Sequence, residues 1–111
     1  MKIENTKAQM RKGILEYCIL SILAQQEHYP SEIIAALKNA ELIVVEGTLY
    51  PLLTRLKNAK YLEYRWVESS SGPPRKYYTL TQEGELFRKE LEATWTVLHS
   101  AVVQITKNAK S

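Results

Sequence analysis

The sequence predicts a mainly α-helical protein that carries one two-stranded β-hairpin. Apolar residues recur every three or four positions in the first half of the chain and again near its C-terminal end, which is the spacing of amphipathic helices. Between these regions, two β-rich runs flank the turn sequence ESSSGPP. A length of 111 residues fits one domain with a modest core.

The first helices are predicted from their apolar faces. Residues 5–12 form a short polar N-terminal helix, and the helix after it ends at EHYP because Pro30 disfavours a helical conformation at Tyr29. Ser31 caps or opens the next helix. The residues expected on these faces are Ile14, Leu15, Cys18, Ile19, Ile22 and Leu23, then Ile33, Ile34 and Leu37. The single cysteine in this set is expected to be a buried hydrophobe, which fits a reducing cytoplasm.

The stretch EGTLYPLLTRL predicts a further helix that buries a stripe of leucines. Gly47 is its expected cap, and the helix ends near Asn58. Pro51 is then the fourth helical residue, where its missing N–H removes no intrahelical bond. The expected buried stripe is Leu49, Leu52, Leu53 and Leu56.

A hairpin and a last helix complete the chain. Residues 61–67 and 75–80 are the expected strands, with ESSSGPP as the loop between them. Trp66 is expected to pack in the core or against the hairpin, and at least one of Tyr77 and Tyr78 is expected in the core. Thr81 is a good N-cap for the last helix, whose apolar residues follow heptad spacing for about two heptads. This heptad seam consists of Leu91, Trp95, Leu98, Val102 and Ile105.

This element order is that of a winged helix-turn-helix followed by one C-terminal helix. We expect residues 1–80, with the short N-terminal helix, to form the winged domain, and residues 81–111 to form the last helix of the same compact unit. The architecture serves many tasks, so the order alone leaves DNA binding open.

The charge distribution points to a polyanionic partner. Residues 2–12 carry four basic and one acidic side chain, residues 13–53 carry one basic and five acidic, and residues 54–77 carry six basic and two acidic. Two basic segments separated by an acidic one suit a protein with one positive face. Ordinary solvated charge is the alternative explanation.

The sequence argues against an enzyme, a metalloprotein and a membrane protein. It contains no aspartate, and neither His28 nor His99 lies in a metal-ligand pattern. Dinucleotide-binding, phosphate-loop and nucleophile-elbow motifs are absent. No apolar run reaches about 18 residues and no cleavable apolar leader is present. We therefore expect a cytoplasmic protein without catalytic residues, cofactor or metal.

Three stretches together resemble the PadR family of bacterial transcriptional regulators: QMRKGILEYCILSIL, GTLYPLLTRLKNAKYLEY and SGPPRKYYTLTQEGE. The resemblance runs from Gln9 to about Ile105, and the single helix after the hairpin is similar to the compact subfamily. One stretch departs from the family pattern: where relatives commonly have a Gly-Tyr or similar pair before the second helix, this chain has EHYPSEII. The departure affects the expected turn at this place and not the family assignment. The resemblance implies a winged helix-turn-helix whose C-terminal helix mediates dimerisation, and a role in repression, often of a neighbouring transporter or detoxification gene or of its own operon.

If residues 47–59 are the recognition helix, its polar start faces a DNA groove. Hydroxyls and backbone N–H groups at the helix start suit phosphate oxygens, and Arg55 can read guanine or clamp a phosphate. The basic pair of the hairpin can contact the sugar-phosphate backbone or enter the minor groove. The expected DNA-binding residues are Thr48, Tyr50, Pro51, Thr54, Arg55, Arg75 and Lys76, with Lys7 and Arg11 as further phosphate contacts. The alternatives are that Tyr50 packs on the hairpin, that Thr48 only caps the helix, and that Lys7 and Arg11 are solvated charge.

A symmetric dimer would bring Trp95 near its own counterpart. It matches by position a Trp that family members place at the dimer interface, where some drug-responsive members sandwich a flat aromatic ligand. His99 lies one turn further along the same face. The expected dimer interface and candidate effector pocket comprise Leu91, Trp95, Leu98, His99, Val102 and Ile105. The alternative is that Trp95 is a dry interface anchor.

The resulting hypothesis is a homodimeric, sequence-specific repressor that binds a pseudo-palindromic operator in double-stranded DNA, with a small aromatic or lipophilic molecule as candidate effector. Two alternatives stay open: a winged-helix protein-interaction module without DNA binding, and a small-molecule binder whose pocket is its main function. The basic hairpin and the polar start of the recognition helix favour DNA.

Overall fold

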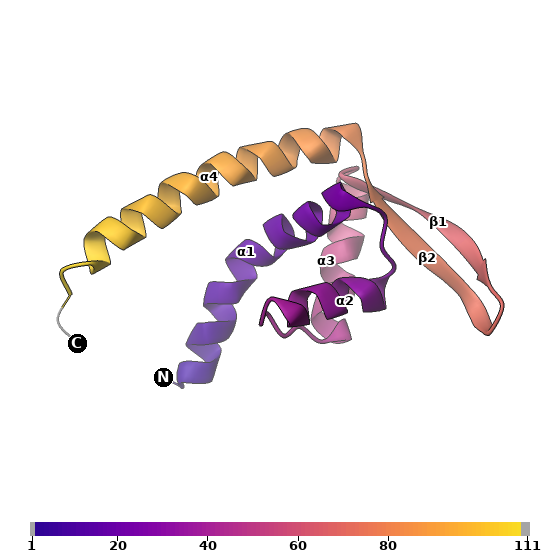
Figure 1. Cartoon of the computed structure of the whole chain (residues 1–111), viewed down its shortest axis with the longest axis horizontal. Coiled ribbons are helices and arrows are strands. Elements are labelled where there is room, and N and C mark those ends of the chain that lie inside the picture. Colours follow the sequence, from indigo (N-terminus) through magenta and orange to yellow (C-terminus); the bar gives the residue numbers. More distant parts are fainter. Residues whose placement is uncertain (1, 110–111) are drawn as a thin grey trace.

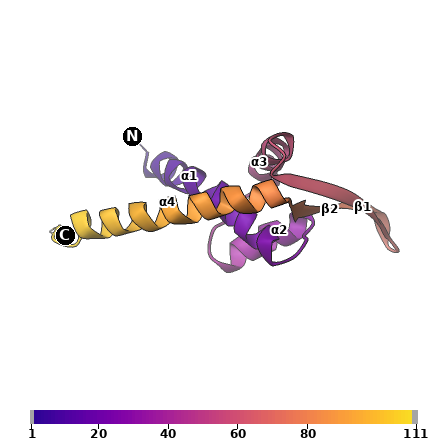
Figure 2. The same cartoon turned by 90° about the horizontal axis from the view of Figure 1, so that it is seen from above.

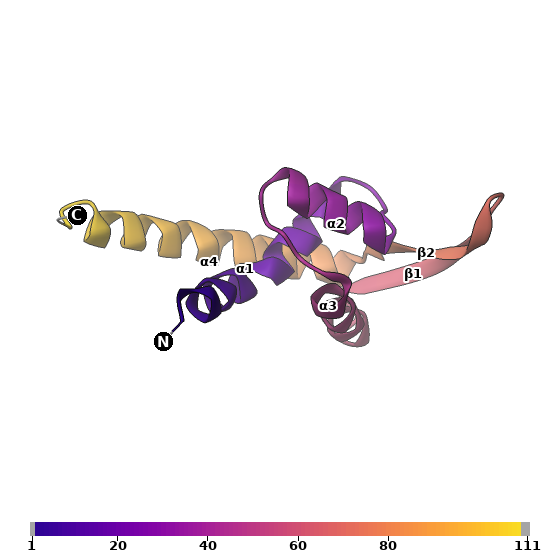
Figure 3. The same cartoon turned by 90° about the horizontal axis from the view of Figure 1, so that it is seen from below.

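A computed structural model describes residues 2–109, which form four helices and one antiparallel hairpin in the predicted order. They are α1 (Ile3–Gln25), α2 (Pro30–Asn39), α3 (Glu46–Asn58), β1 (Leu62–Ser69), β2 (Gly72–Leu80) and α4 (Gln82–Thr106). In Figure 1, α2 and α3 pack beside α1, the hairpin extends from one end, and α4 runs back past α1 toward the other. Figures 2 and 3 show that the hairpin and α4 point in opposite directions. The predicted mainly helical class is confirmed.

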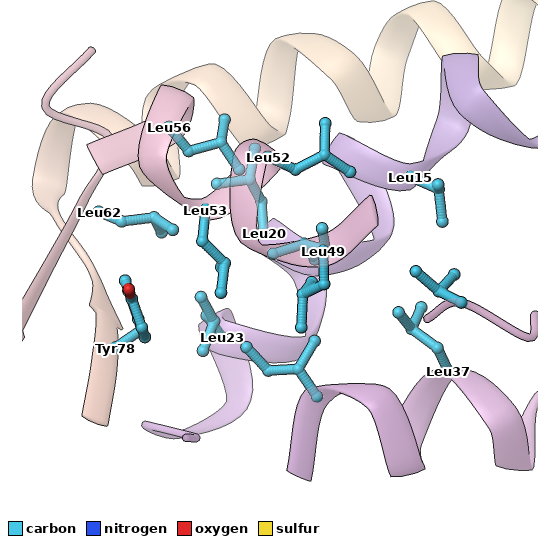
Figure 4. Packing of buried hydrophobic residues seen from close by; sticks show 13 residues of the cluster. Leu15, Leu20, Leu23, Leu37, Leu49, Leu52, Leu53, Leu56, Leu62 and Tyr78 are labelled. Carbon is cyan, nitrogen blue, oxygen red and sulfur yellow. The ribbon is translucent and has the colours of Figure 1, made fainter. Parts of the chain in front are cut away.

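The core lies where the three N-terminal helices meet the base of the hairpin (Figure 4). The predicted leucine stripe of α3 is buried in full. Burial of each such side chain stabilises the fold by about 1.5–3 kcal/mol relative to leaving it exposed. α1 contributes Leu15, Ile19, Leu20 and Leu23, and α2 contributes Ile33 and Leu37. Leu20 was not on the predicted face, and Cys18 is only partly buried beside the core, where burial raises the pKa of its thiol.

The helix boundaries differ from the predicted ones at three N-termini. α1 is continuous from Ile3, so residues 5–12 are its first turns and not a separate helix. α2 begins at Pro30, because proline is well suited to a first helical turn, where no intrahelical N–H bond is lost. α3 begins at Glu46 with Val45 as its N-cap, so Gly47 is the second helical residue and not the cap. Pro51 is then the sixth helical residue and not the fourth, so its missing N–H does remove one intrahelical bond.

The hairpin is longer than predicted. β1 ends at Ser69 and β2 begins at Gly72, so a two-residue turn replaces the expected ESSSGPP loop. Pro73 and Pro74 lie inside β2, where they are tolerated because both strands of a two-stranded sheet are edge strands. The hairpin therefore projects well beyond the helical core. Trp66 of β1 is 61% exposed and therefore lies outside the core; its ring packs on the hairpin beside Tyr64, with the ring centroids 6.2 Å apart, which is the second of its two expected positions. Tyr78 at the base is 5% exposed, as expected for one of the two tyrosines.

A tight junction joins the end of α3 to the start of α4. The Thr81 hydroxyl donates a hydrogen bond to the Lys60 carbonyl at 2.7 Å and accepts one from the Gly84 N–H at 2.9 Å, which confirms the predicted cap. An added Cβ at Gly84 would lie 2.1 Å from the Tyr61 carbonyl oxygen. The Tyr61 and Phe87 rings stack with centroids 4.2 Å apart. The first turn of α4 is thus held directly against the chain that leaves α3.

Candidate nucleic-acid interface

The outward face of α3 is defined by its leucine stripe. Successive helical residues are about 100° apart, so the centre of the face opposite the stripe falls on Gly47, Pro51, Thr54 and Asn58, and all four are exposed. Asn58 was not among the predicted contacts, although the phase of the leucines is sufficient to place it. Thr48 and Arg55 lie on the flank toward α1, and Tyr50 lies on the flank toward the hairpin.

A groove separates the first half of α1 from the start of α3, and we call it the α1–α3 groove. It has a volume of about 780 Å³, and its lining includes the predicted contacts Arg11, Thr48, Pro51 and Arg55. The Arg55 guanidinium donates a hydrogen bond to the Glu16 carboxylate of α1 at 2.5 Å. The groove therefore brings Arg11 and Lys12 of the N-terminal basic segment close to the start of α3. Lys7 is exposed on α1 and does not line this groove.

The other flank of α3 faces the hairpin across a second hollow of about 380 Å³. Tyr50, Arg75 and Lys76 line it together, which brings three predicted contacts from distant parts of the sequence to one place. Trp66 and Tyr29 also line it, and sequence reasoning assigned neither to the interface. We call this hollow the wing cavity.

Aromatic rings hold the cations of the wing cavity. The Arg75 guanidinium carbon lies 4.4 Å from the Tyr29 ring centroid, and the Lys76 ammonium lies 4.5 Å from that of Tyr64 and 5.3 Å from that of Trp66. Such contacts orient a cation without neutralising it. Within residues 2–109, neither Arg75 nor Lys76 forms an ion pair. Both charges are therefore available to an anionic partner.

The root of the hairpin is fastened to the segment between α1 and α2. Arg65 of β1 donates two hydrogen bonds to the Glu27 carboxylate, at 2.5 and 3.1 Å. This bond to the Arg65 guanidinium lowers the pKa of Glu27. His28 and Tyr78 exchange backbone hydrogen bonds at 3.2 and 2.8 Å, and the Tyr29 and Tyr77 rings meet edge to face at 5.1 Å. The position of the hairpin relative to α2 is thereby specified by several contacts at once.

The heptad seam of α4 faces away from the core for most of its length. Leu91 packs against the core, but Leu98 is 54% exposed and Ile105 is 78% exposed. The Trp95 and His99 rings lie 5.3 Å apart, as expected one turn apart on one face. Val102 of the seam is also exposed, and further exposed apolar side chains flank the seam at Val97 and Val103. An apolar surface of this extent on one helix is typical of a protein–protein interface.

Comparison with known proteins supports a regulatory role. Residues 19–92 match the family described as Transcriptional regulator PadR-like family. An X-ray structure of a PadR-like transcription factor from Bacteroides fragilis is 62% identical, with a TM-score of 0.76 over 91% of this chain and 98% of that one. A PadR-like regulator from Bacillus cereus is 38% identical, with a TM-score of 0.80 over 90% and 98%. A PadR family regulator from Eggerthella lenta is 31% identical, with a TM-score of 0.85 over 96% and 93%.

Within residues 2–109, no group of three or more His, Cys, Asp or Glu side chains could hold a metal ion. None of the helices in this range has the length and hydropathy of a membrane span.

Proposed function

Because the chain belongs to the PadR-like family of transcriptional regulators, we propose that it is a homodimeric repressor that binds a pseudo-palindromic operator in double-stranded DNA. Membership of this family confirms that the chain is a regulator and not an enzyme. The observation that carries the proposal is the joint position of the outward face of α3 and the unpaired cations of the wing cavity.

The two parts of this surface would have different roles. The centre of the α3 face offers small groups, so the helix backbone can approach the base edges in a major groove closely. Arg75 and Lys76, held by aromatic rings, would lie along the sugar-phosphate backbone beside that groove. Phosphate contacts set position and most of the affinity, and base contacts set the sequence.

The exposed seam of α4 supports a dimer. Two copies that pack these seams together would bury Leu98, Val102 and Ile105, each of which is more than half exposed. A two-fold axis would present two α3 helices to half-sites about one helical turn apart. The adjacent Trp95 and His99 rings supply flat surfaces at that interface, on which a small aromatic effector would stack.

The proposal is tested by titrating the purified protein against DNA from its own upstream region, at several salt concentrations, beside a scrambled duplex. We expect tight, two-fold-symmetric protection of the natural duplex and weaker, steeply salt-dependent binding to the scramble. Absence of binding to either duplex at low salt would overturn the DNA proposal and favour a protein-interaction module. A lacZ fusion to the same region, in cells with and without the protein, distinguishes repression from activation.

A further inference from the structure

We propose that the α1–α3 groove is a binding site for an aliphatic carboxylate, and that its occupation competes with DNA. The site is separate from the seam around Trp95. The binding itself follows from the lining of the groove, and only the competition rests on the proposed DNA interface.

The floor of the groove is aliphatic. Leu15 of α1 and Leu52 of α3 form part of it, and Ile43, Val44 and Val45 of the α2–α3 connection form one wall. Ile43 is 70% and Val45 is 65% exposed, so this wall presents apolar surface to the groove and to solvent. None of the described lining residues is aromatic, so the groove suits a flexible hydrocarbon chain better than a flat ring.

The rim of the groove is cationic. Arg11 and Lys12 project from adjacent positions on α1, and Arg55 projects from α3. No described lining residue is acidic, and of the three cations only Arg55 has an ion-pair partner within residues 2–109, the Glu16 carboxylate. A carboxylate could therefore reach Arg11 and Lys12 without displacing an existing ion pair. A pocket of several hundred Å³ with an apolar floor and a few polar groups has the character of a small-molecule site.

This chemistry distinguishes the groove from a simple phosphate contact. A DNA backbone would use the three cations but would leave the aliphatic wall exposed. A ligand with an anionic head and a hydrocarbon tail would use both. Because Thr48, Pro51 and Arg55 belong to both the groove and the proposed DNA surface, such a ligand and a DNA phosphate could not occupy this flank of α3 together.

The test uses the whole protein and a series of hexanoate, octanoate and decanoate in isothermal titration calorimetry without DNA. We expect affinity to rise about threefold to fourfold for each added methylene until the groove is filled. Acetate, which lacks the tail, and decyltrimethylammonium, which reverses the charge, should bind at least about tenfold more weakly than decanoate.

Variants then locate the ligand. Ile43→Ser should weaken decanoate binding about fivefold or more, and Arg11→Gln with Lys12→Gln should weaken it similarly. Leu86→Ser, which removes an exposed aliphatic side chain of α4 outside the seam, is the matched control and should leave decanoate binding unchanged. Trp95→Ala tests the alternative site at the seam. Loss of binding only in Trp95→Ala would place the ligand at the seam and overturn the proposal. The proposal would also be overturned if affinity did not change with chain length, or if decyltrimethylammonium bound as tightly as decanoate.

Competition with DNA is measured separately. Decanoate should weaken operator binding of the wild type, and this effect should be lost in Ile43→Ser, which keeps every cation of the DNA surface. If decanoate binds as expected but the protein binds no DNA, the groove stands and the proposed function fails. If decanoate does not bind, and Arg11→Gln with Lys12→Gln lowers the salt dependence of DNA binding, the groove serves the DNA backbone and the inference fails.

Discussion

Arg55 on α3 and Glu16 on α1, 39 positions apart in sequence, form a hydrogen-bonded ion pair at 2.5 Å. Their side chains are 59% and 30% exposed, and an ion pair of that exposure contributes at most about 1 kcal/mol to stability. Its larger effect is electrostatic, because Glu16 neutralises one of the cations that a DNA phosphate would otherwise attract.

We therefore expect Glu16→Gln to strengthen DNA binding. The substitution releases Arg55 for a phosphate and should steepen the salt dependence by up to about one unit in log–log slope. The measurement is fluorescence anisotropy over a salt series. Glu90→Gln removes the same charge from α4, outside the proposed DNA surface, and should leave DNA binding unchanged. Weaker binding in Glu16→Gln would mean that Glu16 holds Arg55 in the conformation that binds DNA.

The wing cations should act on affinity and not on sequence choice. Arg75→Ala and Lys76→Ala should weaken binding to operator and scrambled duplexes alike. Each phosphate that is no longer neutralised should flatten the log–log salt dependence by about one unit. Lys89→Ala on α4 is the control for removal of a charge elsewhere. An unchanged slope in the double variant would remove the hairpin from the interface.

Gly84 is expected to be the least replaceable glycine. In Gly84→Ala, the new methyl group would meet the Tyr61 carbonyl oxygen at 2.1 Å, and overpacking of this kind lowers the free energy of unfolding by about 1–3 kcal/mol. Gly13→Ala is the matched control, because Gly13 lies inside α1 with nothing within 4 Å of the added carbon. That variant should gain about 1 kcal/mol from helix propensity. Urea denaturation measures both, and equal stability of the two variants would contradict the close approach at the α3–α4 junction.

The seam prediction concerns the oligomeric state. Leu98→Glu should give monomers in sedimentation velocity and should lose operator affinity, because a buried unpaired carboxylate at a two-fold axis is strongly unfavourable. Ser100→Glu adds the same charge about 160° further around α4 and should remain dimeric. A dimeric Leu98→Glu protein would refute the assignment of the seam.

Two lowered carboxylate pKa values predict how stability changes in acid. Hydrogen bonds from Arg65 lower the pKa of Glu27, and those from Arg88 lower the pKa of Glu85, both from an ordinary value of 4.5. A lowered folded-state pKa stabilises the fold above the unfolded value, and the stabilisation is lost as pH falls through the lowered pKa.

The free energy of unfolding of wild type and Glu27→Gln should therefore differ at pH 7, and the difference should shrink as pH falls below 4.5 and through the lowered pKa of Glu27. Arg65→Gln should show the same convergence, and the double variant should lose no more than either single one. A difference that persists undiminished at pH 3 would show that the pair acts through packing and not through charge.

The helices and the core were largely predictable because they depend on local periodicity. The leucine stripe of α3 and the cap at Thr81 followed from spacing alone, and both are present. The boundaries of α1 and α3 were less accurate, since the signals at Asn5 and Gly47 compete with residues that extend each helix by a turn or less.

What the sequence could not supply are contacts between distant segments. The pairing of Arg55 with Glu16 and the stacking of Arg75 on Tyr29 depend on how α1, α2 and the hairpin are placed in space. The choice between a core position and a hairpin position for Trp66 depends on the same arrangement: the hairpin extends past the helices, and Trp66 is 61% exposed beside Tyr64. The wing cavity and the α1–α3 groove likewise exist only once the segments have been assembled.

Because the contacts at Thr81 and Gly84 fix the first turn of α4, a small change of angle there becomes a large displacement at the far end of the helix. Its 25 residues span roughly 37 Å, so a tilt of about 5° at one end moves the other by about 3 Å. In the proposed dimer, the angle between the two α4 helices sets the distance between the two recognition helices. One inserted base pair changes the distance between half-sites by about 3.4 Å and their relative rotation by about 35°. A dimer of this geometry would respond to the spacing of the operator half-sites as well as to their sequence, and a molecule bound between the two α4 helices would change the spacing that the dimer fits.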